Sequence, residues 1–289
     1  MVQNGIIYTE DKEVNLLSKD IPSIELDDLK DIFSMDTIDD ELREKRFSTY
    51  TFNGMPVPRV SEILRVGENS EPLLMWAAKL GPKGFFAERN KATTIGSKTH
   101  EMIEHFLTTG EDAQPDDNKV EPGYMRYVWT AYNNFKAWLD FLKVLGYDIE
   151  VIAIEVPVIT PFYGGTADLI CRINGKVYVV DFKTSKKISD KYVLQTSAYA
   201  WGINNGYCPD LQGIHIDGIG IIRIDKERVN VFEDLFLNEN ILWQKEILYK
   251  YTTAFGSFLS AYYHNIEIER LFMRYKKNYT LSSVLGGIM

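Results

Sequence analysis

The stretch GGTADLICRINGKVYVVDFKTS, from Gly164 to Ser185, constrains the fold more than any other part of the chain. Apolar and β-branched residues flank the pair Asn174-Gly175, which is the strongest short-range signal for a two-residue type I′ hairpin turn. With this turn, Ile173 lies opposite Lys176, and the register of both arms follows from that pair. The sequence therefore predicts a β-hairpin whose facing residues can be assigned one by one.

The predicted register brings charged residues together. Asp168 falls opposite Asp181, and because side chains alternate along a strand, Asp168, Asp181 and Lys183 point to one face. Directly opposed Cβ atoms lie about 4.5–5.5 Å apart, and like charges there destabilise a sheet. Either one carboxylate reaches solvent while Lys183 neutralises the other, or a divalent cation lies between the two. A bound cation explains why two carboxylates and a lysine occur together on an otherwise hydrophobic hairpin. Because the ligands are oxygen atoms, Mg²⁺ or Mn²⁺ is the expected ion.

Composition bounds the class of protein. The 289 residues, 45% of them hydrophobic, suffice for one substantial core. Two cysteines, Cys171 and Cys208, give neither a metal-ligand spacing nor a disulfide framework, and a buried thiol is expected at Cys171. The first residues contain no apolar signal core and no apolar run is long enough to cross a bilayer, so we expect a soluble, intracellular protein without a membrane partner.

Charge is distributed unevenly along the chain. The net charge is −9, but residues 1–46 hold 13 acidic and 6 basic residues, a net of −7, which leaves about −2 for the rest. We therefore expect an acidic N-terminal arm, residues 1–46, followed by one domain, residues 47–289. A local basic path can bind nucleic acid despite a neutral total. Two sets of basic residues are candidates, and both are also compatible with an ordinary solvated face: Lys183, Lys186, Lys187 and Lys191, and the segment Glu269–Lys277.

Hydrophobic periodicity predicts alternating groups of helices and strands. The expected helices are Leu26–Phe33, a segment from about Ser61, Leu73–Leu80, Lys83–Ala92, a helix closed by Gly110, Tyr124–Leu145, Asp190–Asn205 with Ser189 or Asp190 as N-cap, and Glu239–Tyr263, after which the chain trails off. The expected strands are a small hairpin turning at Asn53-Gly54, Ile149–Val158, the two arms of the hairpin, Gly213–Ile224 and Arg228–Glu233. This order predicts an α/β (α+β) fold with a mixed sheet flanked by helices.

Two of the expected helices carry polar pairs four residues apart. His100 and Glu104 share one helix face and lie beside the apolar stripe, whereas His105 points elsewhere and should be exposed. Gln195 and Tyr199 share a face of the helix after the hairpin. Each pair is compatible with helix packing against the sheet, and each is also placed to line the carboxylate site.

The ordered set GSKTH, GGTADL, DFK and QTSAY resembles the PD-(D/E)xK nuclease superfamily, and within it the RecB-like exonucleases. The resemblance runs from about residue 57 to residue 205, and the stretch MPVPRVSEILRVG is similar to the entry segment of mitochondrial genome maintenance exonucleases and their phage relatives. It implies a restriction-endonuclease-like fold. The residues matched are Gly96 and His100, Asp168, Asp181 with Lys183, and Gln195 with Tyr199. Ala167 stands where the superfamily has a proline.

The resemblance also implies roles for these residues. Asp168, Asp181 and His100 would bind Mg²⁺ or Mn²⁺, joined by the backbone carbonyl of Phe182 and, more weakly, by Glu104. Lys183 would orient the attacking water or stabilise charge, since neighbouring anions oppose the lowered pKa that a lysine base needs. Gln195, Tyr199, Lys186 and Lys187 would contact DNA or line the site.

The expected function is that of a metal-dependent DNA exonuclease acting on single strands or free ends in replication, recombination or repair. With only two cysteines, the chain cannot hold a four-cysteine iron–sulfur cluster. The sequence has no phosphate-binding loop motif, so we expect no nucleotide cofactor. Unwinding would then come from a partner such as a helicase, recombinase or single-strand-binding protein. Three alternatives remain: a structure-specific endonuclease, a catalytically silent DNA-binding or assembly module, and a hydrolase of small phosphate esters.

Overall fold

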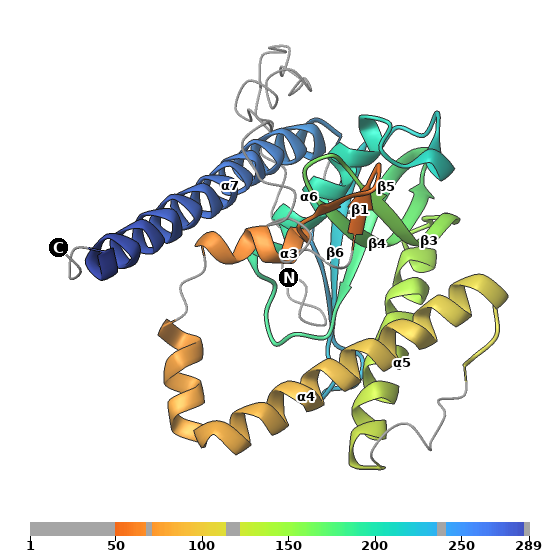
Figure 1. Ribbon diagram of the computed structural model, residues 1–289. Coiled ribbons are helices and arrows are strands. Elements are labelled where there is room, and N and C mark those ends of the chain that lie inside the picture. Colours follow the sequence, from red (N-terminus) through yellow and green to blue (C-terminus); the bar gives the residue numbers. More distant parts are fainter. Residues whose placement is uncertain (1–49, 68–70, 114–121, 236–240, 286–289) are drawn as a thin grey trace.

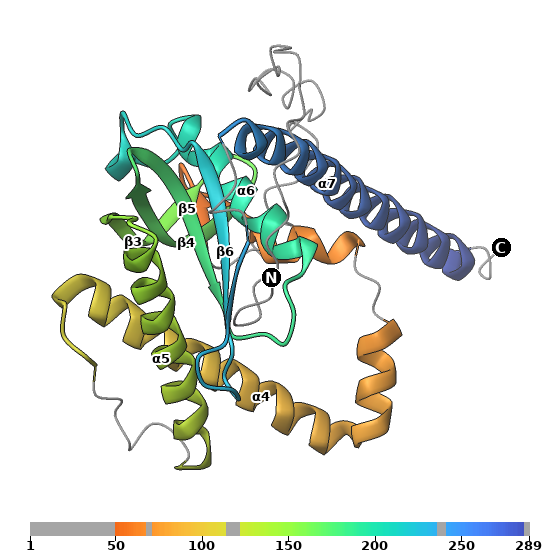
Figure 2. The same cartoon turned by 180° about the vertical axis from the view of Figure 1, so that it is seen from behind.

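The computed structural model describes residues 50–67, 71–113, 122–235 and 241–285. The predicted acidic arm, residues 1–46, and its expected helix lie outside these ranges. The described part is a mixed α/β structure in which helices cover both faces of a five-stranded sheet (Figures 1 and 2). The expected fold class is therefore confirmed at this level.

The sheet has the strand order β3-β4-β5-β6-β7. Its strands are β3 (Ile149–Ile159), β4 (Gly164–Ile173), β5 (Lys176–Lys183), β6 (Gly218–Ile224) and β7 (Phe232–Leu235). Neighbouring strands are antiparallel except β5 and β6, which are parallel. A parallel pair needs a crossover connection, and α6 (Asp190–Asn204) supplies it. Its N-cap is Ser189, whose hydroxyl accepts a hydrogen bond from the backbone of Lys191.

The predicted hairpin is confirmed with its register. Ile173 pairs with Lys176, and the pairing continues without a shift to Leu169 and Val180. Asn174 and Gly175 have φ values of 50° and 78°, as a type I′ turn requires at both central positions. The smaller expected hairpin also forms, from β1 (Tyr50–Phe52) and β2 (Met55–Val57), and leads into α3 (Val60–Ile63) and a 3₁₀ turn (Leu64–Gly67).

Four expectations about element boundaries were wrong. The break expected after Ala92 is absent, since the chain stays helical from there to the end of α4 (Glu71–Thr109). The break expected between Leu80 and Lys83 is present, because two helices meet in a kink at Gly81, whose φ is 68°. Proline at position 82 disfavours helical geometry at the residue before it, so the chain bends there and then resumes (Figure 1). The C-terminal helix α7 (Ile241–Leu285) continues well past residue 263. Strand β6 begins later than expected, at Gly218, because the residues before it form a loop. Strand β7 also begins later, at Phe232, because residues 225–231 form a tight turn.

Two apolar cores lie on opposite faces of the sheet. One packs α3, α6 and α7 against side chains such as Val177 and Val179, and the other packs α4 and α5 (Pro122–Val144) against Val180 and Phe182. Alternation along β5 therefore directs its odd-numbered residues, including Asp181, toward the α6 face. Cys171 and Cys208 are buried free thiols, as expected for Cys171. Among the described helices, none combines the length and apolar character needed to span a membrane.

Candidate metal centre

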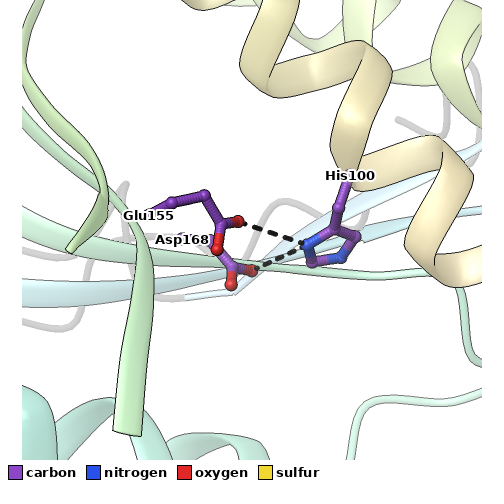
Figure 3. A group of neighbouring side chains, drawn as sticks. All are labelled: His100, Glu155 and Asp168. Carbon is purple, nitrogen blue, oxygen red and sulfur yellow. Dashed lines mark ion pairs between the residues drawn. The ribbon is translucent and has the colours of Figure 1, made fainter. Parts of the chain in front are cut away.

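Three potential metal ligands from three separate elements converge at the end of the hairpin. His100 of α4, Glu155 of β3 and Asp168 of β4 each place one ligand atom within 4.8 Å of the other two (Figure 3). The Nδ1 atom of His100 lies 3.6 Å from Oδ2 of Asp168 and 4.0 Å from Oε1 of Glu155. All three side chains are half-buried, so the group is reached from solvent but is not on an open surface.

A hydrogen bond on the far side of the ring orients His100. Its Nε2 lies 3.0 Å from the backbone carbonyl of Phe182, and because a carbonyl only accepts, Nε2 carries the proton in this contact. The Nδ1 atom of the ring then faces the two carboxylates. A hydrogen bond to the second nitrogen is the usual way in which proteins set the tautomer of a metal-binding histidine.

Phe182 also holds Asp168. Its backbone N–H donates to Oδ2 of Asp168 at 2.8 Å, so one residue of β5 contacts both His100 and Asp168 through its main chain. The Phe182 ring is buried edge-on against Phe135 and Trp138 of α5, at centroid distances of 5.4 and 5.7 Å. The aromatic core thus fixes the backbone that positions the site. The Phe182 carbonyl, expected as a possible ligand, is engaged by His100 and keeps a second lone pair.

Asp181 and Lys183 form a buried ion pair next to this group. Lys183 Nζ lies 2.7 Å from Oδ1 of Asp181 and donates a hydrogen bond to it. Oδ2 of Asp181 is 2.6 Å from the same nitrogen without hydrogen-bond geometry, and no other donor in the described part of the chain reaches it. The Asp181 side chain is therefore buried, and its Oδ2 atom is held by charge attraction to Lys183 without a hydrogen bond.

The pKa values of this pair follow from burial and neighbouring charge. Burial raises the pKa of Asp181 to about 6, with a further contribution from the charge of Asp168, while Lys183 opposes the change. Burial alone would lower the pKa of Lys183, but Asp181 and Asp168 outweigh it, so its pKa is raised above the ordinary value. Lys183 is therefore a protonated ammonium at neutral pH.

The cross-strand prediction for the two aspartates agrees with the register. The pairing of Leu169 with Val180 makes Asp168 and Asp181 the next residues on their strands, and the charge of Asp168 acts on the pKa of Asp181. Asp181 is not part of the three-residue group because its carboxylate is turned toward Lys183.

Glu155 was not identified from the sequence. It lies between Ile154 and Val156, whose partners Leu169 and Ala167 flank Asp168. Its φ of 49° is rare for a residue other than glycine, and such backbone costs about 1–3 kcal/mol and is concentrated at functional sites. Burial, together with Asp168, raises the pKa of Glu155. The available signal was a single glutamate within the apolar run IAIEVPVI.

The predicted pair on α6 also reaches the site. Gln195 Nε2 donates to the hydroxyl of Tyr199 at 3.0 Å. Burial, followed by the charges of Asp181 and Asp168, raises the pKa of Tyr199, although the bond from Gln195 works against this. The Tyr199 ring packs directly on the backbone of β4, because a Cβ built on Gly165 would lie 2.3 Å from its ring.

The remaining predicted residues lie around this centre. Glu104 is exposed and outside the three-residue group, although its charge contributes to the raised pKa of Glu155. His105 is exposed, as expected. Lys186 and Lys187 are exposed in the loop after β5. At Gly96, α4 lies beside this loop, and a Cβ there would make an ordinary contact, 3.6 Å, with Oγ1 of Thr184.

This donor set fits a hard divalent cation. The two carboxylates of the three-residue group offer oxygen ligands of the kind that Mg²⁺ and Mn²⁺ prefer, and they repel one another unless a cation lies between them. Comparison with protein families finds no match for the chain, and comparison with curated proteins finds no relative. The chemistry of the site therefore rests on its own geometry.

Proposed function

We propose that the chain is a metal-dependent DNA exonuclease with the restriction-endonuclease-like fold of the PD-(D/E)xK superfamily, related to RecB-like exonucleases. One observation carries the proposal. Residues that are separated in sequence and that matched the motifs of this superfamily, His100, Asp168 and the pair Asp181–Lys183, lie together at one end of a mixed sheet. Tyr199, from the fourth motif, packs against the same strand.

The carboxylates and the imidazole would hold the metal. Asp168, Asp181, His100 and Glu155 are the proposed ligands, with the carbonyl of Phe182 as a further oxygen. A divalent ion supplies neutralisation of the phosphate charge, a lower pKa for bound water and stabilisation of the leaving oxygen.

Lys183 acts as a cation in this scheme. Its raised pKa keeps the ammonium protonated, so it does not abstract a proton at neutral pH. An ammonium that is already positioned stabilises charge as it develops on the phosphate and orients the nucleophile by hydrogen bonding. Asp181 holds Lys183 in place through its Oδ1 atom. The ring of Tyr192 lies 5.1 Å from Nζ and adds a cation–π contact.

The proposal is tested by digestion of end-labelled linear and circular DNA, each as single and double strands, with Mg²⁺ or Mn²⁺ and with a chelator. We expect mononucleotides or short oligonucleotides from linear molecules, no cutting of circles, and no product in chelator. The matched variants are Asp181→Asn, which should be inactive, and Asp140→Asn, a carboxylate exposed on α5, which should be fully active.

The outcomes separate the alternatives. Cutting of circles would make the protein an endonuclease. DNA binding without cleavage under every metal condition would favour a silent binding module. Cleavage that persists in chelator, or in Asp181→Asn, would refute the proposed mechanism.

A further inference from the structure

Four basic side chains from four separate segments lie in one region, beyond the ends of β5 and β6. They are Lys91 of α4, Arg126 of α5, Lys186 of the loop after β5 and Lys226 of the turn after β6. The pKa of Lys226 is lowered, first by its partial burial and then by the charges of Lys186 and Lys91. Arg126 and Lys226 both interact with Glu227. Lys91 and Arg126 also contact the same ring, that of Tyr127, so the four side chains form one group, which we call the lysine cluster.

The lysine cluster lies at the same edge of the sheet as the metal centre. His100 contacts Phe182, Gly96 approaches Thr184, and α4 therefore runs past the end of β5 with Lys91 further toward its N-terminus. At 1.5 Å per residue, Lys91 is about 13 Å along the helix from His100.

The other two lysines extend past the same strand ends. Lys183 and Arg223 are partners in the parallel pair of β5 and β6, and Lys186 and Lys226 each follow three residues later. Both views show the connection after β6 lying beside α4 (Figures 1 and 2).

The turn that carries Lys226 is held rigidly. Oδ1 of Asp225 accepts hydrogen bonds from the backbone of Glu227 and Arg228 at 2.8 and 2.9 Å. The buried amide of Asn134 donates to the carbonyls of Asp225 and Arg228 at 2.6 and 2.7 Å. The backbone on both sides of Lys226 is thus held by hydrogen bonds.

One aromatic ring contacts two of the four cations without neutralising their charge. Lys91 Nζ lies 4.7 Å from the centroid of the Tyr127 ring, and the Arg126 guanidinium lies 4.5 Å from the same centroid. Cation–π contacts of this kind leave the full positive charge available to an anion.

The cluster has an excess of positive charge. Its four cations outnumber the two carboxylates that act on Lys226 and Arg126, which are Glu88 and Glu227. Within residues 50–67, 71–113, 122–235 and 241–285, none of its three lysines is paired with a carboxylate at ion-pair distance. Converging cations repel one another, and a bound anion removes that repulsion.

We infer that the lysine cluster is a second phosphate-binding site, which takes a backbone phosphate of the nucleic-acid strand a few nucleotides from the phosphate at the metal centre. This inference rests on the proposed function. Contacts of this kind carry no sequence information but set the position and register of a strand. The cluster would thereby deliver the scissile phosphate to the carboxylates.

The test measures binding rather than cleavage. A fluorescent single-stranded oligonucleotide is titrated with the full chain in chelator, by anisotropy, at several salt concentrations. Lys226→Gln should bind about tenfold more weakly, the effect of losing one charge-assisted hydrogen bond. The slope of log affinity against log salt should fall by about 0.7, the value for one phosphate contact of a single strand. Lys91→Gln should behave in the same way.

The control is Lys176→Gln, which removes an exposed lysine at the hairpin turn, at the opposite end of β5. It should leave both affinity and slope unchanged. Circular dichroism and the thermal midpoint establish that each variant is folded, which is expected because removing Lys226 relieves repulsion.

Two results would overturn the inference in different ways. If Lys226→Gln and Lys176→Gln bind the oligonucleotide equally while the wild-type protein binds and cleaves DNA, the lysine cluster is an ordinary solvated surface and the proposed function stands. If the wild-type protein binds neither single- nor double-stranded DNA, the proposed function fails together with the inference.

Discussion

Replacing Asp181 with asparagine should make the stability of the metal-free protein rise relative to that of the wild type as the pH increases. The carboxyl group is buried, and its pKa is raised from an ordinary value of 3.8 to about 6. Between these two values the folded protein binds more protons than the unfolded chain, so this group makes folding less favourable as the pH increases through that window. The amide side chain introduced by Asp181→Asn would carry no charge at any of these pH values.

The magnitude follows from the two pKa values. At about 1.4 kcal/mol per pH unit, a change from 3.8 to about 6 corresponds to about 3 kcal/mol, an upper figure because Lys183 shares the interaction. The difference in free energy of unfolding between Asp181→Asn and the wild type should rise by up to this amount between pH 4 and pH 7, and then level off. Loss of the ion pair leaves the buried ammonium of Lys183 without its carboxylate partner, which adds a destabilising offset to the difference.

Urea denaturation in chelator, at intervals from pH 4 to pH 8, measures this difference. Taking the difference between the two proteins cancels the contributions of other titrating groups, such as Asp225, whose lowered pKa affects both proteins equally. Asp140→Asn, at an exposed position, should follow the wild type at every pH. A difference in free energy of unfolding that does not change with pH, or that falls as the pH rises, would refute a buried carboxyl group with a raised pKa at position 181.

Three further substitutions test other parts of the structure. Glu155→Gln should weaken Mn²⁺ binding by at least the roughly 10–100-fold known for outer-shell partners, and unchanged affinity in a calorimetric titration would remove Glu155 from the ligand set. Gly165→Ala should lower the free energy of unfolding by about 1–3 kcal/mol, since the added methyl group would overlap the Tyr199 ring; a urea midpoint equal to that of the wild type would show that the ring moves freely. Asn134→Ala, which loses three hydrogen bonds to the turn after β6, should cost about 2–4 kcal/mol in the same assay, and a loss below about 0.5 kcal/mol would contradict the rigid placement of Lys226.

The hairpin could be predicted in detail because its determinants are local. A two-residue turn at Asn174-Gly175 and strict alternation on both arms specify which residues face one another. The faces of Asp168 and Asp181 then required no knowledge of the rest of the fold. The same is true of the α6 N-cap at Ser189, which depends on a few consecutive residues.

Glu155 and Lys226 could not be found in this way because their neighbours are distant in sequence. The position of Glu155 depends on a register shift between Val151 and Ala153 and on the turn that follows β3, which is closed by hydrogen bonds to Oγ1 of Thr160. The charge of Lys91 acts on the pKa of Lys226 only because α4 passes near the ends of the strands in the folded protein. Such pairings depend on tertiary packing, which no local pattern encodes.

The extent of the helices was underestimated for a related reason. Gly81 and the proline after it indicate a break, and two helices do meet there in a kink. The second helix continues past Ala92 to Thr109, and this later part packs against the α5 core through Ile95, Met102 and Ile103. Propensity therefore locates the interruption, and tertiary contacts account for the greater length of the second helix.

The central claim is that the carboxylate group binds the divalent ion on which phosphodiester cleavage depends. The most direct test measures Mn²⁺ binding by calorimetry and single-turnover cleavage of a linear single-stranded oligonucleotide over the same range of Mn²⁺ concentrations, in the wild type, Asp168→Asn and Lys183→Met. We predict that cleavage by the wild type follows occupancy of the Mn²⁺ site, that Asp168→Asn loses both binding and cleavage, and that Lys183→Met binds Mn²⁺ but does not cleave. Undiminished Mn²⁺ binding by Asp168→Asn, or cleavage by the wild type at concentrations where no Mn²⁺ is bound, would contradict the claim.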